Sequence, residues 1–360
     1  MLGEFKKTKY GTKTIDVFLP YSLNGLYILS KRSDKIDELV KEIEDLFPLE
    51  TPLNKFFLDL LQDKEMLDSL TLSGQEQTFK DLYVDDNFNL FKETLMELKE
   101  IYCYAPKHMN ELGYSNRFLK DLHHALFSKN VSFYPGEFRK VQSFVGDVIE
   151  EATYIPPDIQ TMQDNLDEME LFMHRDDLSV FIKSSLLYYQ IMANLPFLIG
   201  NQEIARMTSQ LYLIEFDGLN HYIPLSKHLV KIENERINAM NQGDINIFVI
   251  AFLEALKASL METNKMIKAY NNLKKRQQNL IENSNHTIYQ KRRLNEILHQ
   301  SHKTIFLNSE PLEERFGVLP KTIVKRYRLL MDLGIVKCEK TFFSKLYYNH
   351  KMSNIFKWKY

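Results

Sequence analysis

Residues 194–206 have the sequence NLPFLIGNQEIAR, and the interpretation of the rest of the chain depends on this stretch. Before it, Phe181–Ile191 repeats apolar side chains at helical spacing, and Pro196 ends that pattern because proline lacks the backbone N–H that a helix needs. After it, Ile204–Ile214 has the composition of a second helix. Gly200 therefore lies in a short turn that leads into a helix N-terminus, where free N–H groups and the helix dipole favour an anion.

The order of helix, Pro-Phe, Gly-Asn, helix and Arg resembles the signature of the Fic family, His-Pro-Phe-x-Asp/Glu-Gly-Asn-Gly-Arg-x-x-Arg. The matching positions are Pro196, Phe197, Gly200, Asn201 and Arg206. In the family this loop binds a nucleotide, usually ATP, and transfers AMP to a target hydroxyl group. The resemblance implies a mainly α fold, with a Fic-type helical core and a small β-hairpin flap, and nucleotide binding by Gly200, Asn201 and Arg206.

The departures from the signature are chemical. Leu195 stands at the position of the general-base His and cannot take a proton, and Ile199 replaces the acidic residue that holds Mg²⁺. Gln202 replaces the second Gly, and Glu203 puts a negative charge where the first Arg stands. We therefore predict no catalytic residue and no metal site, expect no Mg²⁺, and leave residual binding of ATP or ADP open.

A segment upstream extends the resemblance. Residues 69–82 predict a helix, a break at Gly74 and a second helix, and they are similar to the inhibitory helix of many Fic proteins, Ser-x-x-x-Glu-Gly, with the segment that follows it. Ser73 occupies the place of the inhibitory Glu, whose partner in the family is the Arg matched by Arg206. A chain that transfers no AMP needs no such carboxylate, so the two losses are consistent with each other.

The flap region also matches the family in order. Pro135–Arg139 corresponds to the Pro-Gly-Glu-Phe-Arg segment that precedes the flap, and Val141–Tyr154 is predicted to form the hairpin that aligns a target peptide. Asp158–His174 then resumes helical periodicity. The resemblance covers roughly residues 10–260 and implies a target protein in the flap cleft as a partner.

Helices and strands are predicted elsewhere from periodicity and capping residues. The expected elements are an extended piece at 14–20, helices at about 34–47 and 53–67, helices within 85–128 of which the last runs from Ser115 to Phe127, and further helices from about 243 to 280.

The C-terminal segment has the order of a winged helix. We predict a helix at 290–299, a short strand at 304–307, a helix from about Pro311, a helix at 320–333 and two strands at 335–340 and 345–348. The helix at 320–333 would be the recognition helix, and its cations suit phosphates and guanine edges. The candidate DNA-contact residues are Lys321, Lys325, Arg326 and Arg328.

Composition sets broad limits. A net charge of −2, with 44% hydrophobic and 26% charged residues, is typical of a soluble globular protein and makes no general case for nucleic acid or membrane. Cys103 and Cys338 suggest neither a disulfide framework nor a zinc site, and no apolar run would span a bilayer. We expect a cytoplasmic protein with three regions: an N-terminal helical region at 1–100, a Fic core at 101–285 and a winged-helix-like domain at 286–360.

Each candidate residue also has a purely structural interpretation. Leu195 and Ile199 are expected to be core residues, and His123 a satisfied structural histidine. For Arg206, two roles stay open: a contact to phosphate, and a structural hydrogen bond to a loop carbonyl. A substitute base at Tyr188, His174 or Asn194 stays open, although nothing in the spacing demands one.

Three functions remain. The first, which we prefer, is a degenerate Fic-family protein that acts as an inactive scaffold or regulator. The second is a DNA-binding regulator that uses the C-terminal helix, with the Fic core as a dimerisation or sensing body. The third is a Fic enzyme with altered chemistry, in which Glu203 serves as the base. A homodimer is left open.

Overall fold

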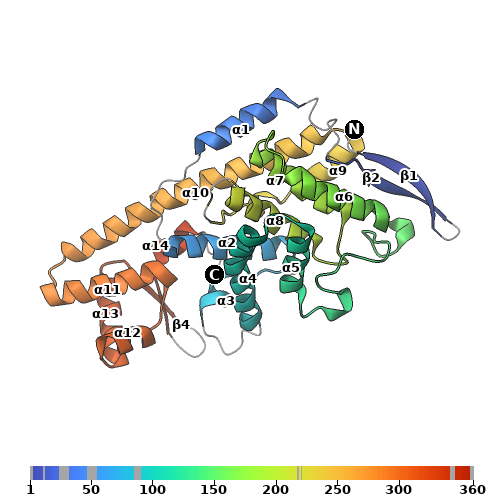
Figure 1. Ribbon diagram of the computed structural model, residues 1–360. Coiled ribbons are helices and arrows are strands. Elements are labelled where there is room, and N and C mark those ends of the chain that lie inside the picture. Colours follow the sequence, from blue (N-terminus) through green and yellow to red (C-terminus); the bar gives the residue numbers. More distant parts are fainter. Residues whose placement is uncertain are drawn as a thin grey trace.

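The computed structural model describes residues 3–10, 13–23, 32–46, 55–84, 91–216, 219, 221–340 and 345–356. The chain is mainly helical, and Figure 1 shows one long helix that runs from the main helical body to the C-terminal elements. The elements of the main body are β1 Gly3–Tyr10, β2 Lys13–Pro20, α1 Asp34–Leu46, α2 Lys55–Leu72, α3 Phe79–Tyr83, α4 Lys92–Leu112, α5 Asn116–Phe127, α6 Ile159–Met173, α7 Val180–Asn194, α8 Asn201–Phe216, α9 Ile232–Gln242 and α10 Ile245–Glu282.

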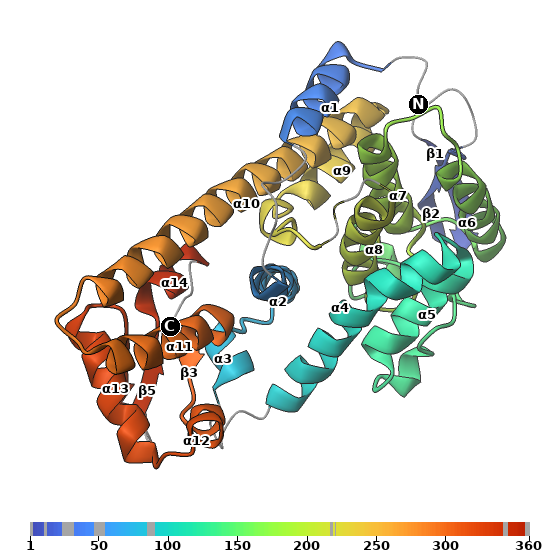
Figure 2. The same cartoon turned by 60° about the vertical axis from the view of Figure 1, so that its left-hand side comes forward.

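Helix α7 is the centre of the main body. Every residue from Phe181 to Asn194 is buried, so the helix is surrounded by packing partners and does not present a single apolar face. Helices α6, α8 and α10 pack directly against it, and α4 and α5 pack against α8. Figure 2 shows the same grouping, with α7 and α8 beside each other and α4 and α5 next to α8. The loop between α7 and α8 is thus held on both sides by the largest hydrophobic core of the protein.

Several helix starts lie where the capping residues predict them. Ser115 caps α5 by accepting a hydrogen bond from the Phe118 N–H, and Asp158 caps α6 in the same way. Thr78 and Asp81 form a reciprocal capping box at the start of α3. The helix, glycine break and second helix predicted for residues 69–82 are therefore confirmed, with Gly74 in a left-handed conformation at φ 83°.

The C-terminal elements follow the predicted order. They are α11 Ile288–Thr304, β3 Phe306–Leu307, α12 Glu310–Phe316, α13 Pro320–Asp332, β4 Lys337–Lys340, β5 Lys345–Tyr348 and α14 His350–Ile355. The three strands form an antiparallel sheet in the order β3-β5-β4, and α11 to β5 share a second, smaller core. The turn between α10 and α11 contains the predicted boundary at residues 285–286, and the winged-helix assignment itself stays a prediction.

Helix α14 returns to the main body instead of extending the C-terminal core. Met352 and Phe356 are buried in the larger core. The Phe356 ring lies 5.6 Å from the ring of Phe57 in α2 and 6.0 Å from that of Phe79 in α3. The C-terminal elements are thereby attached to α2 as well as to α10.

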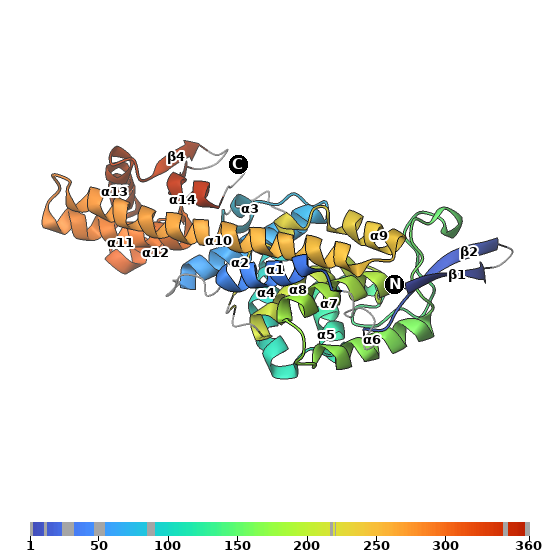
Figure 3. The same cartoon turned by 90° about the horizontal axis from the view of Figure 1, so that it is seen from above.

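Three expectations need correction or completion. Strand β1 was not predicted, and it pairs with β2 along its whole length in a hairpin that projects from the body (Figure 3). The flap segment turns back on itself as expected, but its arms meet in one bridge, Val145 to Tyr154, because the residues between them form a 3-10 turn at Ile149–Glu151. The region from 243 to 280 is one helix of 38 residues, α10. The predicted helix end at 47–48 lies outside the described residues.

Candidate functional site

The loop after α7 begins with a strained residue. Leu195 has φ 42° and ψ 64°, a left-handed conformation that costs a residue with a Cβ roughly 1–3 kcal/mol. Its N–H donates to the Ile191 carbonyl and closes the helix. Its side chain is only 6% exposed and belongs to the main core. As expected for a core residue, Leu195 packs among apolar groups at the position where the signature has His.

Glycine is required at the end of the loop. Gly200 has φ 74°, and a Cβ placed there would lie 2.2 Å from the Phe127 ring. Asn201, the first residue of α8, ties the loop to itself: its Nδ2 donates to the Phe197 carbonyl at 2.8 Å and its Oδ1 accepts from the Phe197 N–H at 2.9 Å. Both functional atoms of the Asn201 amide are therefore used to shape the loop.

His123 supports the loop from below and is neutral. Its ring stacks on Phe197 with 3.9 Å between centroids and an interplanar angle of 3°. The Gly136 N–H donates to Nδ1, so the proton is on Nε2, which donates to the Ile199 carbonyl at 3.2 Å. Burial lowers the pKa of His123 to about 4. This geometry agrees with the expected structural histidine.

Arg139 clamps the other end of the loop. Its guanidinium donates to four main-chain carbonyls: those of Leu195 at 3.0 Å, Val141 at 3.1 Å, Pro157 at 2.5 Å and Asn194 at 3.3 Å. Burial lowers its pKa to about 10, so it remains charged at neutral pH. One buried side chain therefore joins the end of α7 to the flap segment and to Pro157, which precedes the N-cap of α6.

Arg206 turns away from the loop and binds α2. Its Nε donates to Ser69 Oγ at 3.0 Å, and its terminal nitrogen donates to the Ser69 carbonyl at 3.2 Å and to Ser73 Oγ at 2.7 Å. Ser73 Oγ in turn donates to the Glu203 carboxylate at 2.5 Å, and that carboxylate lies 3.7 Å from Arg206. We call Ser73, Glu203 and Arg206, with Ser69, the α2–α8 latch. Arg206 is 1% exposed, and its Nε and one terminal nitrogen donate to protein partners within the latch.

A second buried contact lies beneath the latch. The carboxylate of Glu65 in α2 accepts hydrogen bonds from the N–H and Oγ of Ser226, which starts the short helix η4 Ser226–His228. Glu65 is 2% exposed, and burial raises its pKa to about 8. Sequence reasoning missed this pair, because nothing in the local pattern of α2 marks its one Glu, Glu65, as buried.

A cavity of about 800 Å³ lies beside the latch, between α2, α4, α5 and the start of α8. Phe127, Tyr102 and Met207 line it together with Ser73 and Glu203. Its charged lining consists of one ammonium group and four carboxylates, those of Lys129, Glu97, Glu100, Asp121 and Glu203. Lys129 is already paired with Glu97 at 2.5 Å. The field in this cavity therefore opposes a polyphosphate.

The predicted nucleotide-binding set is only partly brought together. Gly200 and Asn201 lie at the N-terminus of α8, and Glu203, in the first turn, places a negative charge at the same helix end. Arg206 lies one turn further on and faces α2. Ile199 is half-buried, and within the described part of the chain no three His, Cys, Asp or Glu residues gather in a way that could hold a metal ion.

The candidate DNA-contact residues divide into two groups. Lys321, Lys325 and Arg328 are exposed and lie four and three residues apart, hence on one face of α13. The guanidinium of Arg326 lies instead 5.2 Å from the centre of the Phe316 ring, which packs in the C-terminal core. Only the first three present their charges to solvent.

These observations define a helical protein whose central loop, between two buried helices, has the shape of an anion cradle. Residues 114–213 match the model of the Fic/DOC family. The chain therefore carries a Fic/DOC domain at residues 114–213.

Solved structures of Fic proteins are similar in fold. A Fic family protein from Desulfovibrio desulfuricans has a TM-score of 0.56 and 14% identity, over 88% of this chain and 96% of that chain. Fic-1 from C. elegans has a TM-score of 0.45 and 10% identity, over 65% and 72% of the chains. A Fic domain-containing signalling protein from Bacteroides thetaiotaomicron has a TM-score of 0.45 and 17% identity, over 65% and 95%. The first extends the fold likeness well beyond the matched domain.

No helix in the described ranges is both long and apolar enough to cross a bilayer.

Proposed function

We propose that this chain is a catalytically inactive Fic-domain protein that acts as a binding or regulatory scaffold, with at most residual nucleotide binding. The observation that carries the proposal is the α2–α8 latch: Glu203 brings a carboxylate into the cradle, and Arg206 is held by Ser69 and Ser73. A phosphate at this helix end would meet one fixed negative charge and no free cation from α8.

The chemistry of the loop supports the same conclusion. A general base must lie within hydrogen-bond reach of the proton it removes, and Leu195 offers no lone pair at the position of the signature His. Asn194, one candidate for a substitute base, is an amide, and its side chain is bonded to Gln190 and Asn165. Tyr188 is buried, and burial raises its pKa to about 12, so it stays protonated at neutral pH.

The alternative of a Fic enzyme with altered chemistry, in which Glu203 serves as the base, has less support. Its carboxylate accepts a hydrogen bond from Ser73 Oγ at 2.5 Å and lies 3.7 Å from Arg206, so it is already engaged within the protein. A partner for the scaffold would be a target protein bound along the flap segment, where Val145 and Tyr154 form the bridge.

The decisive experiment combines transfer and binding. Purified protein is incubated with ATP labelled in the α-phosphate and Mg²⁺, with and without cell lysate, and ATP and ADP are titrated calorimetrically. We expect no transferred label and, at most, weak binding. Label on the protein or on a lysate target would refute the proposal.

A matched variant tests the cause of the inactivity. Combining Leu195→His, Ile199→Asp, Gln202→Gly and Glu203→Arg restores the residues of the signature. We expect this variant to gain nucleotide affinity, since it exchanges a carboxylate for a cation at the α8 N-terminus. Unchanged binding in a folded variant would place the block elsewhere, in the acidic cavity.

A second candidate function is DNA binding through α13, and it is favoured by the three exposed cations Lys321, Lys325 and Arg328 on one helix face. Duplex binding is expected to fall steeply with salt, and Lys325→Ala with Arg328→Ala is expected to weaken it at least tenfold at low salt. Arg326→Lys, which keeps its charge on Phe316, serves as the control. Absence of duplex binding at low salt would exclude this function.

A further inference from the structure

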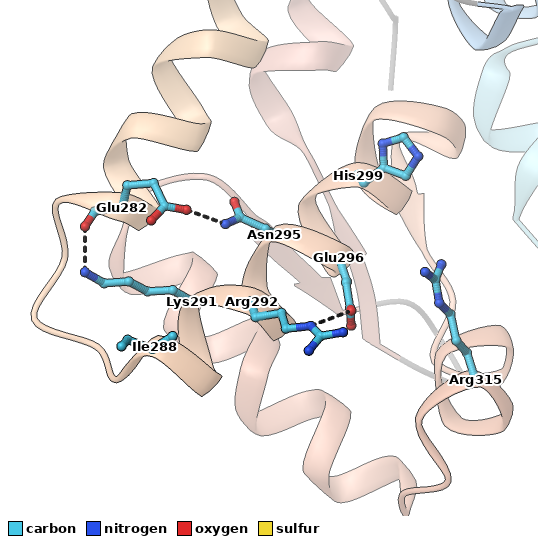
Figure 4. A pocket seen from close by; sticks show the side chains of 8 residues that line it. All are labelled: Glu282, Ile288, Lys291, Arg292, Asn295, Glu296, His299 and Arg315. Carbon is cyan, nitrogen blue, oxygen red and sulfur yellow. Dashed lines mark hydrogen bonds and ion pairs between the residues drawn. The ribbon is translucent and has the colours of Figure 1, made fainter.

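The C-terminal elements form an open cavity of about 630 Å³. It is separate from α13 and from the acidic cavity between α2, α4, α5 and α8 that is described above. It lies between the end of α10, the outer face of α11 and the end of α12 (Figure 4). Its volume falls within the range of about 300–1,000 Å³ that is usual for small-molecule sites.

The framework of this cavity is fixed by two contacts between α10 and α11. Lys291 Nζ donates to the main-chain carbonyl of Glu282 at 2.6 Å, and Asn295 Nδ2 donates to the Glu282 carboxylate at 2.6 Å. Figure 4 shows both bonds at one end of the cavity, with Arg315 at the other. These contacts hold Lys291 and the first half of α11 against the end of α10.

The cations are only partly neutralised. Two carboxylates line the cavity: that of Glu282 accepts from Asn295, and that of Glu296 serves two guanidinium groups, Arg293 at 2.9 Å and Arg292 at 3.7 Å. Arg315 is exposed and, among the described residues, makes no hydrogen bond or ion pair. In Figure 4 its side chain extends toward the face of α11 that carries Glu296 and His299.

The pKa of His299 indicates that the charges around its ring are mainly positive. Burial lowers its pKa, and so do three cations from three elements: Lys303 of α11, Lys274 of α10 and Arg315 of α12. Its ring also faces Phe56 of α2, which carries no charge. The cations that act on this ring thus come from three elements, α10, α11 and α12.

We propose that this cavity binds a phosphate group, with Arg315 and Arg292 as the direct ligands and Lys291 at the rim. Guanidinium groups present paired N–H donors that match phosphate oxygens, and a bound phosphate would supply the counter-charge that Arg315 lacks. The phosphate belongs either to a small phosphorylated ligand or to a nucleic-acid backbone.

The test uses the full chain and inorganic tripolyphosphate as the probe, titrated calorimetrically at low salt. We expect saturable binding that Arg315→Gln weakens at least tenfold. Lys337→Gln, which removes an exposed cation of β4 in the same part of the chain, is expected to leave binding unchanged. Thermal unfolding of both variants establishes that they are folded. Absence of saturable binding, or equal losses in the two variants, would overturn the proposal.

Two further readouts separate the sources and check the location. If the phosphate belongs to nucleic acid, Arg315→Gln also weakens binding of a DNA duplex and lowers the slope of log affinity against log salt by about one. If it belongs to a small ligand, duplex binding is unaffected. In either case tripolyphosphate is expected to raise the pKa of His299, measured from its ring resonances in NMR, and a pKa that does not move would place the ligand elsewhere.

Discussion

Glu203 is the residue that most directly opposes a nucleotide at the α8 N-terminus. Its carboxylate lies in the first helical turn, where the positive end of the helix dipole would otherwise attract a phosphate. It also accepts a hydrogen bond from the Ser73 hydroxyl and so helps to hold the end of α2 against the first turn of α8. One side chain thus acts both as a negative charge and as a tether.

Removing that charge alone should be measurable. We predict that Glu203→Gln raises the affinity for ADP by roughly 5- to 30-fold, which corresponds to about 1–2 kcal/mol for a partly exposed charge near an anion. Glu100→Gln, which removes a carboxylate from the same cavity away from α8, is the control and should change affinity less. Calorimetric titration of both variants checks this, and equal effects would assign the opposition to the cavity as a whole.

Glu65 links stability to pH. Its pKa in the folded chain is raised to about 8 by burial, above the usual value, so the folded state holds the proton more tightly than the unfolded state. Protonated Glu65 therefore contributes its full share to the free energy of unfolding below about pH 4.5. This contribution is lost as the pH rises to about 8, and the free energy of unfolding falls by at most ~1.4 kcal/mol per pH unit.

The corresponding variant is Glu65→Gln, which keeps the shape and cannot ionise. We predict that the difference between the melting temperatures of the variant and the parent chain shifts in favour of the variant from pH 5 to pH 8, because only the parent must bury a charge at the higher pH. Calorimetric melting at several pH values measures the difference. A difference independent of pH would show that Glu65 is ionised throughout.

At the scale of elements, the loop between α7 and α8 is held from both ends. His123 stacks beneath Phe197, Asn201 bonds to the Phe197 backbone, and Arg139 binds the carbonyls at the end of α7. The strained Leu195 persists because its carbonyl is one of the four that Arg139 holds. The shape of the loop is thus fixed by contacts that do not involve the side chains of Ile199, Gln202 or Glu203.

Arg139→Lys tests this clamp. A lysine carries the same charge but has no planar fork, so we predict that it leaves some of the four carbonyls unpaired and lowers the free energy of unfolding by about 2–4 kcal/mol. Lys140→Arg, an exposed neighbour, should change it by less than about 0.5 kcal/mol. Denaturant unfolding measures both. Equal values would mean that the Arg139 contacts are replaceable by water.

At the scale of the whole molecule, α2 connects the latch to the C-terminal elements. Ser69 and Ser73 bind Arg206 at one end of α2, and Phe57 packs on Phe356 near the other. A buried amide pair joins α10 to the start of α14: Gln277 Nε2 donates to Asn349 Oδ1 at 3.0 Å, and Asn349 Nδ2 donates back to Gln277 Oε1 at 3.1 Å.

Asn349 is the residue of this junction that we expect to be most sensitive to mutation, because it also caps α14. We predict that Asn349→Ala lowers the free energy of unfolding by about 2–4 kcal/mol, since it removes a cap and takes from the buried Gln277 Nε2 its acceptor on Asn349. The C-terminal elements are then expected to melt before the main body, as two calorimetric transitions. Asn354→Ala, at an exposed position of α14, should keep a single transition.

Much of the fold was predictable from local patterns. The helix starts at Ser115 and Asp158, the glycine break at Gly74 and the order of the C-terminal elements all follow from capping residues and periodicity, which act over a few residues. Strand β1 was missed because its pairing with β2, not its own pattern, makes it a strand. The return of α14 to the main core was missed for the same reason.

The sequence by itself determined which groups are present at the central loop: no imidazole at Leu195, no acidic group at Ile199, and a carboxylate at Glu203. Only the tertiary structure decided where the remaining groups point. Arg206 binds α2 and not the cradle, Arg326 lies on Phe316, and Arg315 of α12 lines one cavity with Lys291 and Arg292 of α11. The physical reason is that residue type sets the chemistry of a side chain, whereas its partners come from other elements that packing brings together, in the case of Arg206 and Ser69 across 137 residues of sequence.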